Sequence, residues 1–331
     1  MNILITGGAG FIGSHLAEKI LKEGNQVTII DDLSTGKIEN ITRLLNNPNF
    51  KFVNESILNI KIVDSLIEKT DTIFHLAAAV GVYLIVKDPV KVIETNILGT
   101  HSILQLASKY NKKVLIASTS EIYGKSSNVP FNEEDDRLLG PTTKSRWSYS
   151  TSKAVDEFLG LAYYKQKGLK VIIFRLFNTV GPRQESRYGM VIPRLVDQSI
   201  QKKSLTIYGD GQQTRCFCDV NDVVNAIISL SRSDKAIGEV INIGSETEIS
   251  ILNLAKKILQ IVEENQMEIL SRNQFKFIPY EEAYEVGFED MQRRVPDISK
   301  IKGLIGWEPK ISLDQTLSRI ISSKIISPKA N

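Results

Sequence analysis

Residues 3–13 read Ile-Leu-Ile-Thr-Gly-Gly-Ala-Gly-Phe-Ile-Gly, and this stretch decides the fold. A short apolar strand runs into a G-x-x-G-x-x-G turn that opens an amphipathic helix. Glycines permit a tight turn and close approach of the backbone to a pyrophosphate, and a helix N-terminus supplies free N–H donors. In this position the turn predicts a dinucleotide site rather than a purely structural glycine turn. The residues expected to bind the cofactor here are Gly7, Gly10, Phe11, Ile12 and Gly13.

The second strand, at residues 27–30, ends in two acids, Asp31 and Asp32. A carboxylate at this point can accept hydrogen bonds from the adenosine ribose hydroxyls, and it repels a 2′-phosphate. The two acids therefore favour NAD over NADP as the cofactor. The alternative is that both carboxylates only cap the loop that follows.

The first 180 residues alternate short apolar runs with stretches of helical periodicity. Strands are expected at 3–5, 27–30, 51–53, 72–76, 114–117 and 171–175, and helices at 12–23, 38–46, 60–68, 89–110 and 143–167. Strands separated by helices indicate βαβ units. We therefore expect an α/β fold with a doubly wound parallel sheet, the NAD-binding Rossmann arrangement.

After residue 178 the pattern loosens, and glycines and prolines separate shorter elements. Helical stretches stand out at 190–202 and 250–264, and a last helix is expected after a turn at 306–309. We divide the chain into an NAD-binding domain at 1–180 and a smaller α/β substrate-binding lobe at 181–331. The chain can cross between these two parts more than once.

The composition excludes several classes of function. The 331 residues include 41 Lys and Arg against 38 Asp and Glu, and a net charge of +3 is too small for nucleic acid to be the main partner. No apolar run approaches the roughly 20 residues that cross a bilayer, and no signal peptide precedes the first strand. We therefore expect a cytoplasmic protein with no membrane partner. Cys216 and Cys218 lack the further ligands that zinc requires, so no metal site is expected.

A tyrosine and a lysine are spaced for proton transfer. Tyr149 and Lys153 stand at i and i+4, on one face of a predicted helix. A free tyrosine has a pKa of about 10, which a nearby ammonium and the positive nicotinamide of NAD⁺ would lower. Tyr149 could then remove a proton from a substrate hydroxyl. The spacing is common by chance, but residues 118–121 (Ser-Thr-Ser-Glu) follow another strand at the sheet edge where ligands bind.

Taken together, these motifs resemble the extended short-chain dehydrogenase/reductase family. The matching segments are the glycine turn, Asp31, 75–78 (His-Leu-Ala-Ala), 95–96 (Thr-Asn), 118–124, the Tyr149/Lys153 pair and 177–182 (Phe-Asn-Thr-Val-Gly-Pro). The resemblance implies bound NAD and a C-terminal lobe for a nucleotide diphosphate sugar. UDP is the nucleotide it implies, and GDP or dTDP stays open.

The resemblance also implies roles for single residues. Leu76, Ala77, Ala78 and Asn96 would join the cofactor site, where Lys153 would bind the nicotinamide ribose. Tyr149 would be the base and Thr119 its hydroxyl partner. Asn178 would contact the sugar nucleotide, while Arg215 and Arg294 would hold phosphates or a carboxylate. The family often has an aspartate after the third strand, whereas this chain has Asn-Glu-Ser-Ile at 54–57, and His75 is interpreted as a packed structural residue.

Residues beside this common core bear on the reaction. The 4,6-dehydratases of the family typically carry Asp-Glu after the threonine, and here the pair is Ser120-Glu121, which resembles UDP-glucuronate decarboxylases. Segments 140–149, 213–217 and 288–296 also resemble that group, and they place Glu121, Arg146 and Arg294 where the glucuronate is handled. Oxidation at C4 gives a β-keto acid that loses CO₂ readily, and arginine can orient its carboxylate through two hydrogen bonds. The product would be UDP-xylose or the UDP-4-keto-pentose.

Other functions stay open at this point. Small residues in the 78–82 loop leave room for a 4-keto sugar to turn over, and the segment that begins at Arg187 is typical of epimerases, so a UDP-glucose or UDP-glucuronate 4-epimerase is the alternative. Each of the three residues also has an alternative role outside decarboxylation. Glu121 could merely hydrogen-bond the sugar, Arg294 could bind pyrophosphate alone, and Arg146 could be a surface residue. A non-catalytic NAD-sensing regulator is disfavoured by the intact tyrosine and lysine. The family commonly forms homodimers, and the helices at 89–110 and 143–167 are the candidates for that interface.

Overall fold

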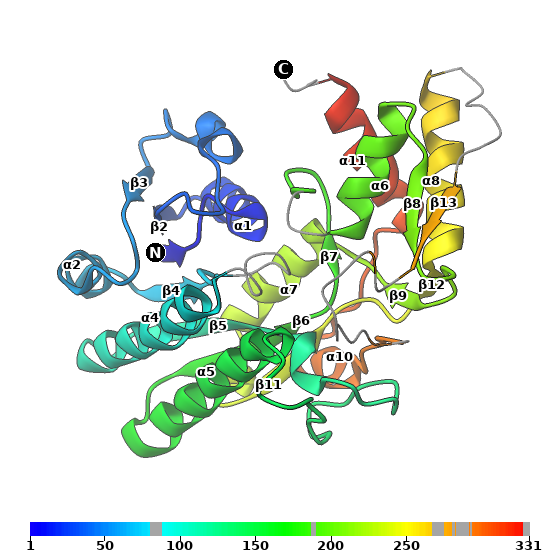
Figure 1. Ribbon diagram of the computed structural model, residues 1–331. Helices are drawn as coiled ribbons and strands as arrows, with labels where there is room; N and C mark the ends of the chain where they lie inside the picture. The colour runs from blue at the N-terminus through cyan, green and yellow to red at the C-terminus, as the bar shows by residue number, and fades with distance from the viewer. Residues whose placement is uncertain are drawn as a thin grey trace.

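The computed structural model describes residues 1–79, 88–186, 190–266, 275–279, 282, 291 and 293–326. Its larger part is a seven-stranded sheet with the order β11-β6-β5-β4-β1-β2-β3 (Figure 1). All pairings in this sheet are parallel, which confirms the predicted doubly wound α/β fold. Its strands are β1 (Asn2–Thr6), β2 (Gln26–Asp31), β3 (Phe50–Asn54), β4 (Thr72–His75), β5 (Lys113–Thr119), β6 (Val171–Leu176) and β11 (Val240–Ile243).

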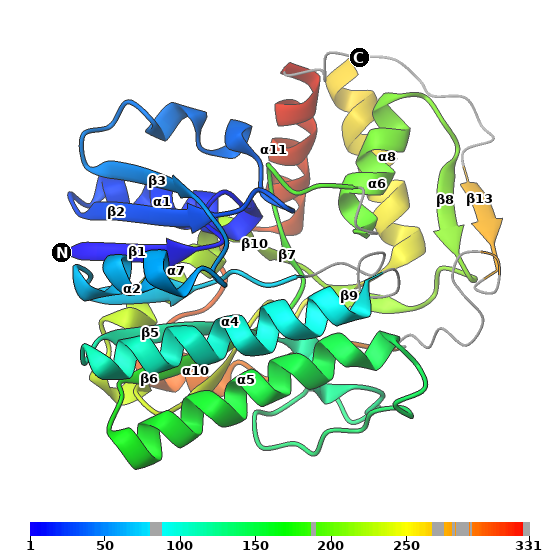
Figure 2. The same cartoon turned by 60° about the vertical axis from the view of Figure 1, so that its left-hand side comes forward.

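Helices cover both faces of this sheet, and Figure 2 shows α4 and α5 side by side on one of them. That face carries α2 (Ile60–Glu68), α4 (Pro89–Lys109) and α5 (Arg146–Lys167), and the other carries α1 (Phe11–Lys22), α7 (Val220–Ser231) and α10 (Ser299–Ile305). Side chains alternate between the faces along β1, so Ile3 and Ile5 join one core cluster and Leu4 joins the other. Burial on both faces explains why these strands are continuous apolar runs.

A second, smaller core lies beside the carboxyl edge of the sheet (Figure 1). Its helices are α6 (Val191–Ile200), α8 (Ile251–Gln266) and α11 (Leu313–Ile326). Short strands complete it in three pairs: β8 (Leu205–Tyr208) with β13 (Phe275–Ile278), β9 (Thr214–Cys216) with β12 (Glu248–Ser250), and β7 (Thr179–Val180) with β10 (Cys218–Asp219). Apolar side chains from α6, α8 and α11 pack together here, which gives this part its own core.

The prediction of a helix at 38–46 is wrong. The structure has only two 3₁₀ turns there, η1 (Ile38–Asn40) and η2 (Thr42–Leu44). Asn40 donates its side-chain amide to the carbonyl of Ala9 at 2.8 Å, and the Lys37 amide donates to the same oxygen at 3.0 Å. The segment is therefore tied to the glycine turn, and Asn and Thr are weak helix formers.

After the second lobe begins, the chain returns to the large sheet. Helix α7 and strand β11, which the sequence reading did not single out, add a helix and an edge strand to it. Val223, Ile227 and Ile241 pack in the same core as Ile5 and Leu16. Residues on both sides of position 180 therefore build the seven-stranded sheet and its covering helices.

Within the described ranges, no helix is long and apolar enough to span a membrane. The same ranges contain no group of three or more His, Cys, Asp or Glu residues arranged to hold a metal ion. Cys216 and Cys218 are buried free thiols, and burial raises the pKa of Cys216 to about 12. These two cysteines are packed side chains of β9 and β10.

Candidate active site

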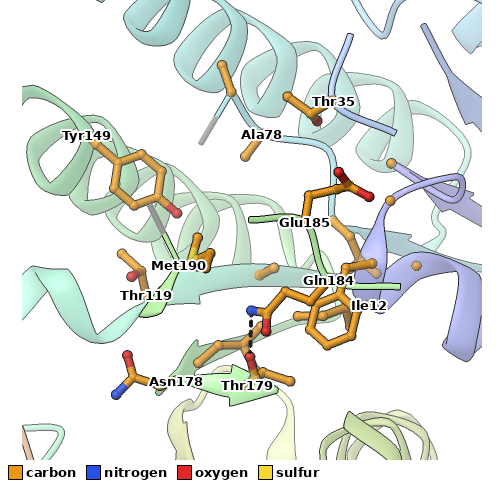
Figure 3. Close-up of a pocket in the computed structure, with 18 of the residues that line it drawn as sticks. Ile12, Thr35, Ala78, Thr119, Tyr149, Asn178, Thr179, Gln184, Glu185 and Met190 are labelled. Carbon is orange, nitrogen blue, oxygen red and sulfur yellow. Dashed lines mark hydrogen bonds between the residues drawn. The ribbon is translucent and has the colours of Figure 1, made fainter. Parts of the chain in front are cut away.

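A cleft of about 580 Å³ opens at the carboxyl ends of the central strands. Its walls come from the turn after β1, the ends of β4, β5 and β6, the start of α5, and the second lobe. Strand β1 lies between β2 and β4, which is the point where a doubly wound sheet reverses its order and binds ligands. Figure 3 shows Tyr149 and Ile12 at opposite ends of the part drawn, with Met190 and Gln184 between them.

The glycine turn forms one end of this cleft. Gly7 has φ of +70°, and a Cβ atom on Gly13 would lie 2.2 Å from the Gly7 carbonyl oxygen. Gly8, which was not assigned from the sequence, is equally constrained because its Cβ would lie 2.4 Å from that of Ile29. Helix α1 begins at Phe11 and presents its N-terminus to the cleft. Bare backbone and free N–H donors fit the pyrophosphate of a dinucleotide.

Both acids at the end of β2, Asp31 and Asp32, line the same end of the cleft. Asp31 accepts hydrogen bonds from the amides of Ala9 and Leu33, each at 2.9 Å, and burial raises the pKa of its carboxyl. Asp32 is exposed and accepts from the Ser34 amide at 2.9 Å. The carboxylates therefore organise the loop and also face the position expected for the adenosine ribose. Glu55, Ser56 and Ile57, from the segment that lacks the usual aspartate, line the cleft beside them.

Asn96 shapes the wall after β4 without lining the cleft itself. Its side-chain oxygen accepts from the Ala79 amide at 2.8 Å, and its amide donates to Ser152 Oγ at 3.1 Å. It thereby ties the wall segment to helix α5. The wall residues are Leu76, Ala77, Ala78 and Ala79. The rest of that loop, including Val80 and Gly81, lies outside the described residues.

Tyr149 and Thr119 converge on the other end of the cleft (Figure 3). The Tyr149 ring is 9% exposed, and burial together with the Glu121 charge raises the pKa of its phenol, against a hydrogen bond with Thr119. Thr119 Oγ1 also accepts from the Glu121 amide at 3.1 Å, which starts the 3₁₀ turn η3 (Ser120–Tyr123). A substrate hydroxyl placed here could contact both the phenol and the threonine.

Lys153 lies one turn further along α5, below the cleft wall. Its Nζ donates to Asp156 Oδ2 at 2.7 Å, and the two side chains are 3% and 0% exposed. Lys153 is not among the residues that line the cleft. Its proposed contact with a nicotinamide ribose stays a prediction.

Two arginines meet one glutamate beside Tyr149. Arg294 Nη2 donates to Glu121 Oε1 at 2.6 Å, and Arg146 Nη2 lies 2.8 Å from Glu121 Oε2. Burial alone would raise the pKa of Glu121, but the charges of Arg294 and Arg146 outweigh it and lower the pKa to about 2. Both arginines line the cleft and neither lies on the surface, and Ser120 lines it too. The site thus holds a buried carboxylate between two guanidinium groups.

Asn178 and Arg215 line the cleft on the side of the second lobe. Asn178 donates its side-chain amide to the Cys216 carbonyl at 3.0 Å, and Arg215 Nη1 donates to the Thr214 carbonyl at 2.7 Å. The structure thus brings both residues to the cleft, and their contact with a sugar nucleotide stays a prediction. Arg187 lies outside the described residues.

The family model for GDP-mannose 4,6 dehydratase matches residues 4–320. The chain belongs to the extended short-chain dehydrogenase/reductase family. Among its relatives in that family, the UDP-N-acetyl-alpha-D-glucosaminuronate decarboxylase of Bacillus cytotoxicus is 44% identical over 319 residues, 96% of each chain. UDP-glucuronic acid decarboxylase 1 of Danio rerio is 38% identical over 331 residues, 99% of this chain and 74% of its own.

A solved structure of the same family shares the fold. UDP-glucuronic acid 4-epimerase from Bacillus cereus, in complex with UDP-glucuronic acid and NAD, superposes with a TM-score of 0.85 and 32% identity. The match covers 98% of this chain and 100% of the other. Extended short-chain dehydrogenase/reductases have therefore been captured with NAD bound on this fold.

Sequence reasoning missed part of the site that this family member builds. Arg183, with φ of +72°, contacts Glu18 through Nη2 and Ser14 Oγ through Nη1. Glu185 Oε1 lies 2.7 Å from Lys37 Nζ. These contacts hold residues 183–185 against α1 and Lys37, and all three residues line the cleft. The Gly-Pro pair at 181–182 marked a turn here, but a turn signal does not reveal which distant residues the turn will contact.

Proposed function

We propose that this protein is an NAD-dependent decarboxylase of a UDP-linked uronic acid, UDP-glucuronate or its 2-acetamido counterpart. The observation that carries the proposal is Glu121 held between Arg146 and Arg294, next to Tyr149 and Thr119 in one cleft. Two relatives that match this chain over most of its length are decarboxylases of these two sugars. They differ at C2 of the sugar, whereas the C4 hydroxyl and the C6 carboxylate are common to both.

The chemistry at C4 uses Tyr149 and Thr119. Thr119 would hold the C4 hydroxyl, and Tyr149 would take its proton as the carbon is oxidised. NAD⁺, held by the glycine turn and Asp31, would supply the electron-pair acceptor for this oxidation. The resulting ketone is β to the C6 carboxylate, so the C5–C6 bond breaks, its electron pair enters the ketone as an enolate, and CO₂ leaves. A proton then adds to C5, and Tyr149 returns its proton when C4 is reduced.

The arginines suit the binding of a carboxylate. Arg146, Arg294 and ionised Glu121 sum to a net charge of +1, which would attract a uronate, and the bound carboxylate would bring the group to neutrality. An arginine can hold a carboxylate through two parallel hydrogen bonds and so fix the plane of the group that must leave. Glu121, with a pKa of about 2, is ionised at neutral pH and is therefore suited to position the arginines rather than to protonate C5.

We also propose a homodimer formed through α4 and α5. These helices lie side by side on an outer face of the molecule (Figure 2). Leu98 on α4 is 51% exposed and Phe158 on α5 is 67% exposed. Large apolar side chains at this exposure are suited to a protein partner.

The deciding experiment is incubation of the purified protein with UDP-glucuronate and, separately, with UDP-N-acetylglucosaminuronate. Release of CO₂ with formation of a UDP-pentose or its 4-keto form supports the proposal, and the faster substrate identifies the group accepted at C2. UDP-galacturonate without CO₂ would instead establish the 4-epimerase that the structural likeness to the Bacillus cereus enzyme suggests. Bound NAD(H) with no turnover of any UDP-sugar would indicate a regulator.

A further inference from the structure

Helix α5 buries an ion pair that the proposed reaction does not use directly. Lys153 Nζ and Asp156 Oδ2 lie 2.7 Å apart, and both side chains are almost completely removed from solvent. A buried ion pair contributes little to stability, because desolvation of the two charges offsets their attraction. Asp156 Oδ1 has no hydrogen-bond partner within the described residues. A stability role does not explain why a carboxylate stands here.

A chain of polar side chains connects this carboxylate to the cleft wall. The Thr100 hydroxyl, on α4, faces Asp156 and works to lower the pKa of its carboxyl, against the dominant effect of burial. Thr100 Oγ1 lies 3.0 Å from His75 Nε2, and His75 Nδ1 lies 2.8 Å from Thr6 Oγ1. Thr6 Oγ1 accepts from the Ala77 amide at 3.1 Å, and Ala77 lines the cleft. The ends of β1 and β4 are thereby linked to Asp156.

The donors and acceptors fit one direction along this chain, with the proton of His75 on Nε2. Burial, together with the Lys153 charge, lowers the pKa of His75 to about 3, so its ring is neutral at pH 7 and carries one N–H. The Ala77 amide can only donate, which leaves the Thr6 hydroxyl free to donate to Nδ1. Nε2–H then donates to Thr100, whose hydroxyl hydrogen is left to point toward the Asp156 carboxylate. The chain ends on an acceptor and favours an ionised Asp156.

We propose that Asp156, supported by the Thr6–His75–Thr100 chain, is a positioning residue that pairs with the Lys153 ammonium and fixes it one helical turn from Tyr149. An ammonium has three N–H donors, so the pair leaves two for a nicotinamide ribose or for Tyr149. Asp156 acts through Lys153 and touches neither substrate nor cofactor. This inference rests on the proposed oxidation at C4.

The charges around the pair determine what its loss would do. His75 approaches Lys153 from β4, while Tyr149, Asp156 and Glu157 belong to α5 itself. Glu121, from η3, also faces Tyr149. Asp156→Asn leaves the ammonium buried without its counter-ion, which favours the neutral amine. It also removes one of the negative charges that raise the pKa of Tyr149, so the basic and acidic limbs of the rate profile both move to lower pH.

Two measurements test the proposal on Asp156→Asn, with Asp64→Asn as the matched control, because Asp64 pairs with Lys109 on the surface at 3.0 Å. The first is the pH profile of C4 oxidation in a single turnover. We expect its basic limb to move down by about one pH unit or more in Asp156→Asn and to stay in place in Asp64→Asn. A variant that is slower at every pH, with both limbs unmoved, would show a merely structural role and overturn the proposal.

The second measurement is the affinity for NAD⁺ as a function of pH, which needs no sugar substrate. We expect the dissociation constant of Asp156→Asn to rise with pH relative to wild type, because an uncharged, unfixed Lys153 no longer binds the ribose. A ratio that does not change with pH would count against the proposal. If wild type releases no CO₂, the proposed function fails, and the NAD⁺ measurement still decides the role of Asp156.

Discussion

Tyr149 has surroundings that do not by themselves make it a base. Burial and the Glu121 charge raise the pKa of its phenol above 10, and only the hydrogen bond with Thr119 works in the opposite direction. We therefore expect the positive charge that favours the phenolate to come with the oxidised cofactor. If NAD binds as proposed, the base strength of Tyr149 would then follow the redox state of the cofactor.

Tyr149→Phe tests this base directly. We expect a loss of at least about 100-fold in the rate of C4 oxidation, because proton removal by a positioned group contributes that much. The rate is measured as NADH absorbance after mixing with UDP-glucuronate. NAD content and urea unfolding serve as controls and should match wild type. Retained turnover would mean that another residue removes the proton.

Arg294→Lys separates oxidation from decarboxylation. Arg294 contacts Glu121 at 2.6 Å, and lysine keeps the charge but cannot hold a carboxylate by a planar fork. We expect CO₂ release to fall about 10- to 100-fold, with a smaller effect on NADH formation. Arg293→Lys is the matched control, because Arg293 is 56% exposed and pairs with Glu248. Equal losses in both reactions would argue against a role for Arg294 in orienting the carboxylate.

Glu121 should also link stability to pH. Burial opposes its ionisation, but Arg294 and Arg146 lower its pKa from 4.5 to about 2. Because the pKa of Glu121 is lower in the folded protein than in the unfolded chain, its ionisation stabilises the fold. This contribution is complete at pH values above the unfolded pKa, and it is lost as the pH falls from about 4.5 toward 2. We therefore expect urea unfolding to show a difference between wild type and Glu121→Gln that shrinks below about pH 4.5. A difference independent of pH would contradict an ionised Glu121.

At the scale of elements, the conformation of the glycine turn depends on how closely helix α1 packs against it. A Cβ on Gly13 would meet the Gly7 carbonyl oxygen at 2.2 Å, so Gly13→Ala must open the turn. We expect bound NAD to fall by about tenfold or more and the free energy of unfolding by about 1–3 kcal/mol. Gly303→Ala in α10, where no atom lies within 4 Å of the new Cβ, is the control and should stabilise slightly. Unchanged NAD content in Gly13→Ala would argue against pyrophosphate binding at this turn.

The sequence predicted elements well where periodicity and packing agree. Strands β1 to β6 and helices α1, α2 and α4 begin and end within a few residues of the expected positions, because both faces of the sheet are buried. The segment 38–46 failed because contacts with Ala9 override a weak helical pattern. Helix α7 and strand β11 were missed because they return to the large sheet from far along the chain. The pattern of a short apolar segment does not predict which sheet the segment will join.

At the scale of the whole molecule, the site is made by residues that are distant in sequence. Glu121 and Arg294 are 173 positions apart, and Arg175 reaches Glu157 and Tyr123 in a buried network that joins β6, α5 and η3. The resemblance placed most candidate residues on the cleft wall. It could not show that Glu121 bridges both arginines, or that Lys153 pairs with Asp156, since such contacts depend on side-chain geometry.

Assembly is the last property that belongs to the whole molecule. If α4 and α5 form the proposed interface, Phe158, 67% exposed, is buried in the dimer. Phe158→Glu would then place a charge in an apolar contact, and we expect the dimer dissociation constant to rise about 30-fold or more. Sedimentation velocity over a range of concentrations measures this constant. Phe277→Glu is the control, because Phe277 is 52% exposed on β13, in the smaller part of the molecule. A dimer that is equally tight in both variants would place the interface elsewhere on the surface.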